Sequence, residues 1–563
     1  MSTPRSADVH LAVIGGGING TGVARDATLR GLSVALFERN DIAFGASGNS
    51  SGMIHGGPRY LTDDPNITRT SCLDSGYIQA IAPHLLFRVP FLMPIGPVGT
   101  ERTPINLVDA FFEAYDFYQP LKRGKPHTRL SPDDLFRLEP GLFGGGGASA
   151  AGLTGGITFD EWGIDGNRLA VANAVDAAER GAKIHTHTTV EQVLRVPSDG
   201  AVRGVRVRDL LTGKSSVVTA RAVVNATGAW GPLMARLAGI SSHATRVRPG
   251  KGIHIVFDRR LTNFAIVATA IDGRQIFIEP WENVSLLGTT DDDFYGDPDD
   301  VRATSEEVRY LLQGIAQVFP GVASARAIGT TAGVRPTLYD YGPNEDVLSR
   351  DHRVIDHAKD GARGLFSMLG GKLASYRIFA EEATNQVVQY LGAAVAPCRT
   401  HTTRLPGGEK VVAKGALGAR MGIDAIAASR LVYRHGARAE LIAECVAEKP
   451  LWASVVCPCE PVIEAEIRHV IRHEMARTVD DVARRTRLGL GACGGMRCAA
   501  RCGQIVAEER GLAPRDGVRQ ALRFLARQAS TRAVVVGQVQ AQQEALSLAS
   551  VRAELGPLLE EDE

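Results

Sequence analysis

Residues 8–38 alternate between short apolar runs and an amphipathic stretch. Residues 10–14 read HLAVI, residues 21–32 read TGVARDATLRGL, and residues 33–38 read SVALFE. A short apolar run is typical of a buried strand, whereas apolar positions three and four apart are typical of a helix. The pattern therefore predicts a strand, a helix and a second strand, which together form one βαβ unit.

Further along the chain, several runs favour a second, antiparallel sheet. Residues 201–222 alternate apolar and polar side chains on both sides of LTGK, which predicts a hairpin. Residues 254–260, 275–282 and 284–291 add three β-rich runs. We expect a sheet from this part of the chain to roof the βαβ unit. The glycine-rich stretch 141–156 predicts a flexible connection and not a core element.

After about residue 400 the pattern becomes mainly helical. LPGGEK at 405–410 has the composition of a domain boundary, and residues 422–436 have the spacing of a helix. A short apolar and aromatic segment at 104–125 ends in basic residues. That segment could face a membrane or a partner, but its pattern favours a buried helix.

Composition and charge narrow the class of protein. The chain has 563 residues, of which 44% are hydrophobic and 22% charged, and its net charge is +1. These values are typical of a globular protein of three or four packing units and give no reason to expect a nucleic-acid partner. The N-terminal MSTPRSADV lacks the apolar core of a secretory signal, and no long uncharged apolar run predicts a spanning helix. We therefore expect a cytoplasmic protein.

The turn after the first strand carries a GxGxxG motif. Its glycines are Gly15, Gly17 and Gly20, and the second strand ends in Glu38. Glycines there let the backbone approach a pyrophosphate, the helix N-terminus offers N–H groups, and the acid can accept from ribose hydroxyls. The fingerprint alone does not decide between NAD and FAD. The small and hydroxylated loop at 44–61, followed by glycine turns at 223–231 and 367–377, favours a flavin.

An ordered set of motifs resembles the FAD-dependent glycerol-3-phosphate dehydrogenases, which are D-amino-acid-oxidase-like flavoproteins. The motifs are GGGINGTGVARDATLRGLSVALFE, SGMIHGGPRYL, VVNATGAW, IEPWENVSLLGTTDDDF, TAGVRPTL and LGGKLASYR, and the resemblance covers about residues 8–385. It implies an α/β fold with a Rossmann-like FAD-binding domain. The cofactor-binding residues that we expect are Gly15, Gly17, Ile18, Asn19, Gly20, Glu38, Arg39, Ser47, Ser51, His55, Gly56, Val190, Thr227, Gly228, Gly371 and Lys372.

The candidate substrate site is rich in cations beside glycine turns. A substrate phosphate would favour arginine, whose planar fork matches phosphate oxygens. The resemblance implies that Arg59, His254, Arg335, Arg350 and Lys372 line this site, and Tyr60 lies beside Arg59. We expect catalysis to involve His55, His254 and Arg335, with either histidine as the base, because imidazole accepts a proton near neutral pH.

Four cysteines form two close pairs near the C-terminus. Cys457 and Cys459 flank one proline, and Cys493 and Cys498 follow in a glycine-rich stretch. A zinc ion is a rival to an iron–sulfur cluster, but a CxC pair is cramped for one tetrahedral ion, and a disulfide within it would be strained. By contrast, the pair His185 and His187 is not expected to bind metal, and His469 with His473 favours a solvated helix face.

The cysteine region resembles the bacterioferritin-associated-ferredoxin-like domain. In that family a CxC motif and a second cysteine pair bind a 2Fe–2S cluster. The longer spacing of the second pair is similar to that of the A subunits of anaerobic glycerol-3-phosphate dehydrogenases. Cys502, four residues beyond Cys498, competes as the fourth ligand.

These resemblances imply a plan of domains. An FAD-dependent oxidoreductase domain would span 8–400, with FAD-binding segments at about 8–75, 160–232 and 330–390. An antiparallel β substrate cap would be formed by about 76–159 and 233–329. A helical linker at 401–450, the 2Fe–2S domain at 451–512 and a helical tail at 513–563 would follow.

The implied reaction is oxidation of sn-glycerol 3-phosphate to dihydroxyacetone phosphate by hydride transfer to FAD. The cluster would relay single electrons to partner subunits or a quinone, so the protein would sit peripherally on the cytoplasmic face of the membrane, and dimerisation is left open. Alternatives are an amine or 2-hydroxy-acid dehydrogenase with the same electron exit, a non-enzymatic flavin and iron–sulfur redox sensor, and an enzyme whose C-terminal domain has lost its cluster.

Overall fold

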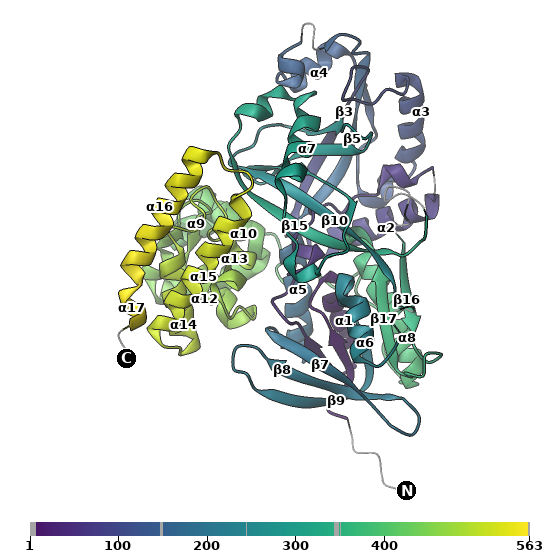
Figure 1. The fold of residues 1–563 in the computed structure, drawn as a ribbon, viewed down its shortest axis with the longest axis vertical. Helices are drawn as coiled ribbons and strands as arrows, with labels where there is room; N and C mark the ends of the chain where they lie inside the picture. Colours follow the sequence, from purple (N-terminus) through teal and green to yellow (C-terminus); the bar gives the residue numbers. More distant parts are fainter. Residues whose placement is uncertain are drawn as a thin grey trace.

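The computed structural model describes residues 7–62, 64–146, 150–241, 243, 245–342, 348 and 351–560. Its elements form two sheets flanked by helices and a helical C-terminal domain (Figure 1). The two sheets lie one above the other in Figure 1, and the helices from α9 onward, coloured green to yellow, pack to one side of both. The α/β fold class predicted from the sequence is therefore confirmed.

The first sheet carries the predicted βαβ unit. Its strand order is β16-β17-β9-β1-β2-β6, and β8 joins β7 to β9. The neighbours of β1, which are β2 and β9, both run parallel to it. The strands are β1 (Val9–Ile14), β2 (Val34–Phe37), β6 (Lys183–His185), β7 (Thr188–Arg195), β8 (Val202–Asp209), β9 (Ser215–Asn225), β16 (His352–Asp356) and β17 (Leu365–Gly370).

Helices cover one face of this sheet and close its core. The contacts of α1 with α5 and α8 fill the space with small side chains such as Ala24, Ala27 and Ala174, all fully buried. The predicted hairpin at 201–222 is confirmed, since β8 and β9 pair antiparallel. The helices of this part are α1 (Ile18–Leu29), α2 (Pro65–Ile81), α5 (Gly166–Glu179), α6 (Gly231–Leu237) and α8 (Tyr376–Leu391).

The second sheet contains the β-rich runs expected in the antiparallel cap, but β3 and β11 run parallel, and β15 joins it from a segment expected in the FAD-binding part. Its strand order is β14-β10-β13-β12-β11-β3-β5-β4, and β15 pairs with β10. The strands are β3 (Leu86–Ile95), β4 (Thr128–Leu130), β5 (Gly155–Ile164), β10 (Val247–Phe257), β11 (Ala265–Thr269), β12 (Gln275–Trp281), β13 (Val284–Gly288), β14 (Asp292–Asp293) and β15 (Ala327–Leu338). The helices α3 (Ile105–Asp116), α4 (Pro132–Leu138) and α7 (Ser305–Ala316) accompany it.

Two segments of the cap, the glycine-rich stretch and helix α3, differ from or add detail to the sequence predictions. The glycine-rich stretch at 141–156 was expected to lie outside the core, but Leu142 and Phe143 are buried among the cap residues beneath α7. Glycine on either side lets the backbone turn sharply, so the two apolar side chains can enter the core. Helix α3 is only half buried, because Phe112 packs inward whereas Leu107 is 62% exposed.

The C-terminal domain is held by its own apolar core and by buried charges. Its helices are α9 (Lys414–Met421), α10 (Ala425–His435), α11 (Ala439–Glu448), α12 (Glu464–His473), α13 (Val479–Thr486), α14 (Ala499–Arg510), α15 (Pro514–Arg532), α16 (Gln538–Leu555) and α17 (Pro557–Glu560). A small ribbon of β18 (Val455–Cys457) and β19 (Val462–Ile463) precedes α12. Among the residues described, no helix is long and apolar enough to span a bilayer.

Candidate active site and thiol cluster

A cavity of about 1620 Å³ lies between the two sheets. Single ligand pockets usually measure roughly 300–1,000 Å³, so this cavity has room for a dinucleotide together with a small substrate. Most of the predicted site residues line it. These are Gly15, Gly17, Ile18, Asn19, Glu38, Arg39, Ser47, Ser51, His55, Tyr60, Val190, Thr227, Gly228, His254, Arg335, Gly371 and Lys372.

The turn between β1 and α1 forms a cradle without side chains. Gly15 has a φ of +105°, and a Cβ there would lie 2.7 Å from the Ala226 carbonyl oxygen. Gly17 is the N-cap of α1 and offers no capping side chain. The buried Oδ1 atom of Asn19 has no hydrogen-bond partner among the residues described. The N–H groups of the helix N-terminus fit the pyrophosphate of a dinucleotide, whereas the Asn19 oxygen, an acceptor, suits a hydroxyl donor.

Glu38 lies at the end of β2, where the fingerprint places its acid. Its Oε2 atom accepts a hydrogen bond from Gly16 N at 2.6 Å, and its Oε1 atom accepts one from Asn40 N at 2.7 Å. Burial raises the pKa of this carboxyl, and the two backbone donors act against that shift. The position suits contact with ribose hydroxyls, because the carboxylate is fixed and faces the cavity.

Arg39 bridges the two domains at the edge of the cavity. Its guanidinium donates to Asp299, which precedes α7 in the cap, and lies 5.7 Å from the ring centre of Trp230. Trp230 Nε1 also donates to Asp299 at 2.8 Å. The side chain expected to bind cofactor therefore also links the FAD-binding sheet to the cap.

Gly20 and Gly56 do not face the cavity. A Cβ at Gly20 would lie 2.0 Å from the Gly15 carbonyl oxygen, and a Cβ at Gly56 would lie 2.3 Å from Cys72 Sγ. Both glycines therefore permit close packing behind the cavity wall. Neither position has room for a side chain, and the contact of both glycines with the cofactor stays a prediction.

Two cations reach the cavity from different domains. Arg335 on β15 donates from Nη1 to Asp291 Oδ1 and from Nη2 to Thr289 Oγ1, each at 3.0 Å. Lys372 follows β17; its Nζ lies 3.0 Å from Ser71 Oγ and 4.0 Å from the ring centre of Tyr60. Guanidinium and ammonium groups that converge on one cavity favour an anionic substrate.

The two candidate histidines differ in environment. His254 on β10 is 3% exposed, and its Nε2 atom has no partner among the residues described. Burial and the nearby Arg335 guanidinium lower the pKa of His254 to about 3, so the ring is neutral. His55 is less buried and lines the cavity on the segment that follows η1 (Ala46–Gly48).

Residues that sequence reasoning missed hold the segment of His55 in place. Gly56 N donates to Glu161 Oε2 at 3.3 Å, and Glu161 Oε1 accepts from Tyr115 Oη at 2.6 Å. Lys122, fully buried, forms an ion pair with the same carboxylate at 2.5 Å. These residues come from β5, α3 and the segment after α3, so no local motif could have indicated them.

Two predicted substrate residues lie wholly or partly outside the described part of the chain. Arg350 lies outside the described residues. The backbone of Arg59 is part of a 3-10 helix, Pro58–Tyr60, at the cavity edge, but its side chain is also outside the description.

The four predicted thiols come together in two pairs. Cys459 Sγ lies 3.7 Å from Cys493 Sγ. The Cys498 thiol donates to the Gly495 carbonyl oxygen at 3.6 Å, and its interaction with Cys457 lowers the pKa of the Cys457 thiol and raises that of Cys498. Two sulfurs bound to one tetrahedral metal lie about 3.8 Å apart, since each metal–sulfur bond measures about 2.3 Å. The separation of Cys459 and Cys493 is therefore that of two ligands of one metal atom.

The four thiols do not converge on a single point. Among the residues described, three possible metal-ligand atoms lie within 4.8 Å of one another only at His435, His469 and Glu474, so no three of the cysteines meet that limit. Cys502 lies on α14 and is fully buried, and burial raises the pKa of its thiol.

Of the histidines outside the cavity, one lies in an environment that the sequence did not predict. His185 stacks on Phe37 with ring centres 5.1 Å apart, whereas His187 Nε2 lies 2.8 Å from Asp481 Oδ2, so the two rings have different neighbours. His469 was expected on a solvated helix face, which is wrong: it is 4% exposed. The face of α12 that carries it packs against α10, and this docking is not visible in the helical spacing.

Two family models match the chain. The model described as FAD dependent oxidoreductase matches residues 10–377, and the C-terminal domain of alpha-glycerophosphate oxidase matches residues 398–516.

Individual relatives cover nearly the whole chain. It is 34% identical over 510 residues to the A subunit of the anaerobic glycerol-3-phosphate dehydrogenase of Escherichia coli, a match that covers 90% of this chain and 89% of that one. It is 35% identical to glycerol-3-phosphate dehydrogenase 1 of Mycobacterium tuberculosis, covering 86% and 92%. The FAD complex of glycerol-3-phosphate dehydrogenase from Bacillus halodurans superposes with a TM-score of 0.73 at 26% identity, covering 94% and 95%.

Proposed function

The chain belongs to the family of FAD-dependent oxidoreductases, and on that premise we propose that it oxidises sn-glycerol 3-phosphate to dihydroxyacetone phosphate. The observation that carries the proposal is the convergence of Arg335 and Lys372 on one cavity beside the two histidines. The names of the relatives support this choice of substrate. The resemblance that the ordered motifs predicted is confirmed at the level of the family.

The cations would bind the substrate phosphate. Arg335 is held by Asp291 and Thr289, so its planar fork is oriented before substrate arrives. Lys372 would neutralise a second phosphate oxygen from the opposite side. We assign Arg59, Tyr60 and Arg350 to the same site as proposals that rest on the motifs.

We propose His55 as the base. His254 is neutral but a weak proton acceptor, because its pKa is lowered to about 3. Its unpartnered Nε2 is suited to orient a substrate hydroxyl by a hydrogen bond. His55 is held by the hydrogen bond from Gly56 to Glu161, so its ring can accept the hydroxyl proton in a fixed position.

FAD, when bound, supplies the hydride acceptor for the carbon that carries the hydroxyl. The glycine cradle at Gly15 and Gly17 would hold its pyrophosphate, and Glu38 its ribose. The loop with Ser47 and Ser51 and the turns with Thr227, Gly228 and Gly371 would surround the rest. The cap sheet would exclude water from the reacting atoms.

The thiols are proposed to hold a 2Fe–2S cluster. Cys459 and Cys493 are close enough to share one metal atom, and no three of the described cysteine sulfurs lie within 4.8 Å of one another, which supports two metal atoms better than one tetrahedral zinc ion. The interaction between Cys457 and Cys498 supports Cys498 as ligand in preference to Cys502. Such a cluster, when bound, supplies a one-electron carrier for the electrons that substrate oxidation releases.

The electron acceptor is proposed to be a partner subunit or a quinone at the membrane. The Escherichia coli relative is named as one subunit of its enzyme, which supports partner subunits here. Attachment would be peripheral and on the cytoplasmic face.

Turnover tests the activity directly. With a dye acceptor, the purified protein should oxidise glycerol 3-phosphate and leave amino acids and lactate unchanged. Turnover of amino acids or lactate alone would assign it to another flavoprotein class, and no turnover of any alcohol would favour a redox sensor. Iron and acid-labile sulfide analysis after anaerobic purification should find about two iron atoms per chain, lost in Cys457→Ser.

A further inference from the structure

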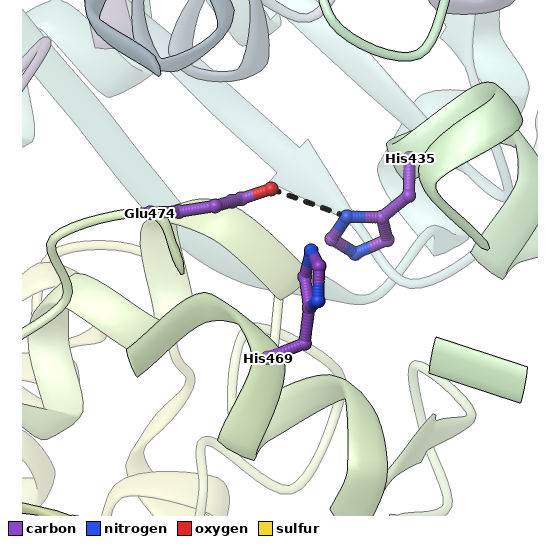
Figure 2. A group of neighbouring side chains, drawn as sticks. All are labelled: His435, His469 and Glu474. Carbon is purple, nitrogen blue, oxygen red and sulfur yellow. Dashed lines mark ion pairs between the residues drawn. The ribbon is translucent and has the colours of Figure 1, made fainter. Parts of the chain in front are cut away.

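A buried group of metal-ligand side chains lies outside the cavity and the thiol cluster. His435 ends α10, His469 lies on α12, and Glu474 is the C-cap of α12. One ligand atom from each lies within 4.8 Å of the other two, and all three side chains are buried. Figure 2 shows the three side chains converging on one point. Nothing in the proposed oxidation uses them.

His469 is the least explained member of the group. It is only 4% exposed, yet its buried Nδ1 atom makes no hydrogen bond to any residue that the structure describes. Figure 2 shows a ring nitrogen of His469 directed toward the space between Glu474 and His435. Burial lowers the pKa of His469 to about 3, which leaves its ring neutral and able to donate a lone pair.

The other two groups are oriented as metal ligands are. His435 Nε2 lies 2.9 Å from Glu466 Oε1, and Glu466 is a buried carboxylate that accepts this hydrogen bond. In the neutral ring the lone pair is therefore on Nδ1, which lies 3.3 Å from Glu474 Oε1. Two ligand atoms bound to one tetrahedral zinc ion lie about 3.3–3.4 Å apart, given bonds of about 2.0–2.1 Å.

We propose that His435 Nδ1, a ring nitrogen of His469 and Glu474 Oε1 bind one divalent transition-metal ion of the zinc type. Two imidazoles and a carboxylate select such an ion over magnesium or calcium, which take oxygen ligands. Glu466 orients His435 as carboxylates do behind metal-bound histidines. The fourth position opens to a cavity of about 50 Å³, lined also by His473 one helical turn along α12, which has room for a water ligand.

Charge sets the affinity of this site. Arg168 on α5 donates to Glu474 Oε2 at 2.5 Å and to Oε1 at 3.0 Å, and its Nη2 lies 3.4 Å from His435 Nδ1. Arg434 donates to Glu466. These two arginines already balance the two carboxylates, so an ion adds positive charge to a neutral cluster. Arg168 must also release Oε1 and Nδ1 while keeping Oε2. We therefore expect micromolar binding, on the order of −8 kcal/mol, in place of the much tighter binding of structural zinc sites.

The ion would act as a clamp between domains. Through Arg168 and Glu474, the group joins α5 of the FAD-binding domain to α10 and α12 of the C-terminal domain. A ligand that binds only the docked arrangement stabilises it by mass action. None of the three ligands lines the large cavity, so an ion here would change stability and leave the chemical step unaltered.

Zinc binding by the complete FAD-loaded protein tests the proposal. The protein is dialysed against about 20 µM zinc chloride, roughly ten times the expected Kd, and its zinc is measured by mass spectrometry. The wild type should hold one zinc per chain more than His469→Gln, and zinc should raise its thermal midpoint but not that of the variant. His243→Gln, which alters an exposed histidine of the cap, should behave as wild type.

The thiols are the main competing site, so Cys459→Ser is measured in parallel. Retention of the extra zinc in Cys459→Ser and its loss in His469→Gln and in Glu474→Gln supports the proposal. Equal zinc in wild type and His469→Gln, or loss only in Cys459→Ser, overturns it. FAD content and circular dichroism check that each variant is folded, and an anomalous diffraction peak between the three side chains gives evidence independent of the variants.

Discussion

The nucleotide cradle and the thiol cluster are assembled in different ways. The cradle is one continuous turn, in which Gly15 and Gly17 shape the site with backbone alone. The thiols come from two loops on either side of α12 and α13, and they meet only because the helices between them fold back. The cradle is thus a product of local sequence, whereas the thiol site is a product of tertiary packing.

The two regions also differ in how charge supports them. Around the cradle, backbone N–H groups satisfy Glu38. Behind the thiols, Arg485 is fully buried and pairs with Asp41 of the FAD-binding domain at 2.7 Å, and Arg487 pairs with Glu460, next to Cys459. Site geometry that depends on buried ion pairs is sensitive to the loss of one partner. Substitutions can therefore separate the two modes of assembly.

The largest effect is expected from removing Asp41. Asp41→Ala leaves the fully buried guanidinium of Arg485 and the partly exposed one of Arg484 without their shared carboxylate. Breaking a buried pair in this way costs about 3–5 kcal/mol of unfolding free energy. Urea unfolding measures it, and Glu440→Ala, which breaks an exposed pair with Arg420, is the control with a loss of about 0.5 kcal/mol. Equal losses would mean that the junction is no more sensitive than the surface.

Acid should weaken the C-terminal domain through Glu466. Arg434 and His435 hold the pKa of this carboxyl at about 2, below its unfolded value of 4.5. Its contribution to stability is therefore present above pH 4.5 and is lost as the pH falls toward 2, by about 3 kcal/mol. Unfolding midpoints between pH 5 and 3 should fall less steeply in Glu466→Gln, because that side chain does not titrate. An unchanged slope would show that other carboxyls dominate.

Removing the Arg335 side chain should weaken the reaction with the substrate and leave the nucleotide cradle and the thiol cluster intact. Arg335→Ala is expected to lower kcat/KM for glycerol 3-phosphate by about 100-fold, because a charge-assisted contact contributes about 1.5–3 kcal/mol. FAD and iron content should stay unchanged. Arg259→Ala, on an exposed guanidinium of the cap, should keep full activity. An equal loss of activity in both variants would show that Arg335 has no special role in the reaction.

The smallest effect is expected at Gly20. Gly20→Ala places a methyl group against the Gly15 carbonyl oxygen, and overpacking of this kind costs about 1–3 kcal/mol. The strain should appear as lower FAD occupancy, read from the flavin absorbance, with the iron content retained. Gly415→Ala, which meets nothing within 4 Å, is the control. Loss of iron in Gly20→Ala would show that the two regions do not assemble independently.

The accuracy of the sequence interpretation follows the same division. The βαβ unit and the hairpin at 201–222 were predictable, because hydrophobic period and turn residues act over a few positions. The burial of Leu142 and Phe143 was not, since it depends on the surface that α7 presents. The same holds for His469, which α10 covers.

The site residues were likewise predictable only where a local motif marked them. Cations beside glycine turns were recognisable, and the structure places Arg335 and Lys372 on one cavity. Glu161 and Lys122, which support the His55 segment, carry no local signal, because their partners are far apart in sequence. Arg39 was expected to bind cofactor from the family resemblance, and its partner Asp299, which comes from the cap, had no local signal.

The attachment of the C-terminal domain to β15 has a kinetic consequence. Thr330 Oγ1 of β15 donates to the carbonyl oxygen of Thr531 at the end of α15, and Arg335 lies five residues further along the same strand. A change that loosens α15 would therefore displace the guanidinium that faces the substrate. Variants in the last hundred residues should raise KM for a substrate that they never touch, and screens for weak binders should recover them.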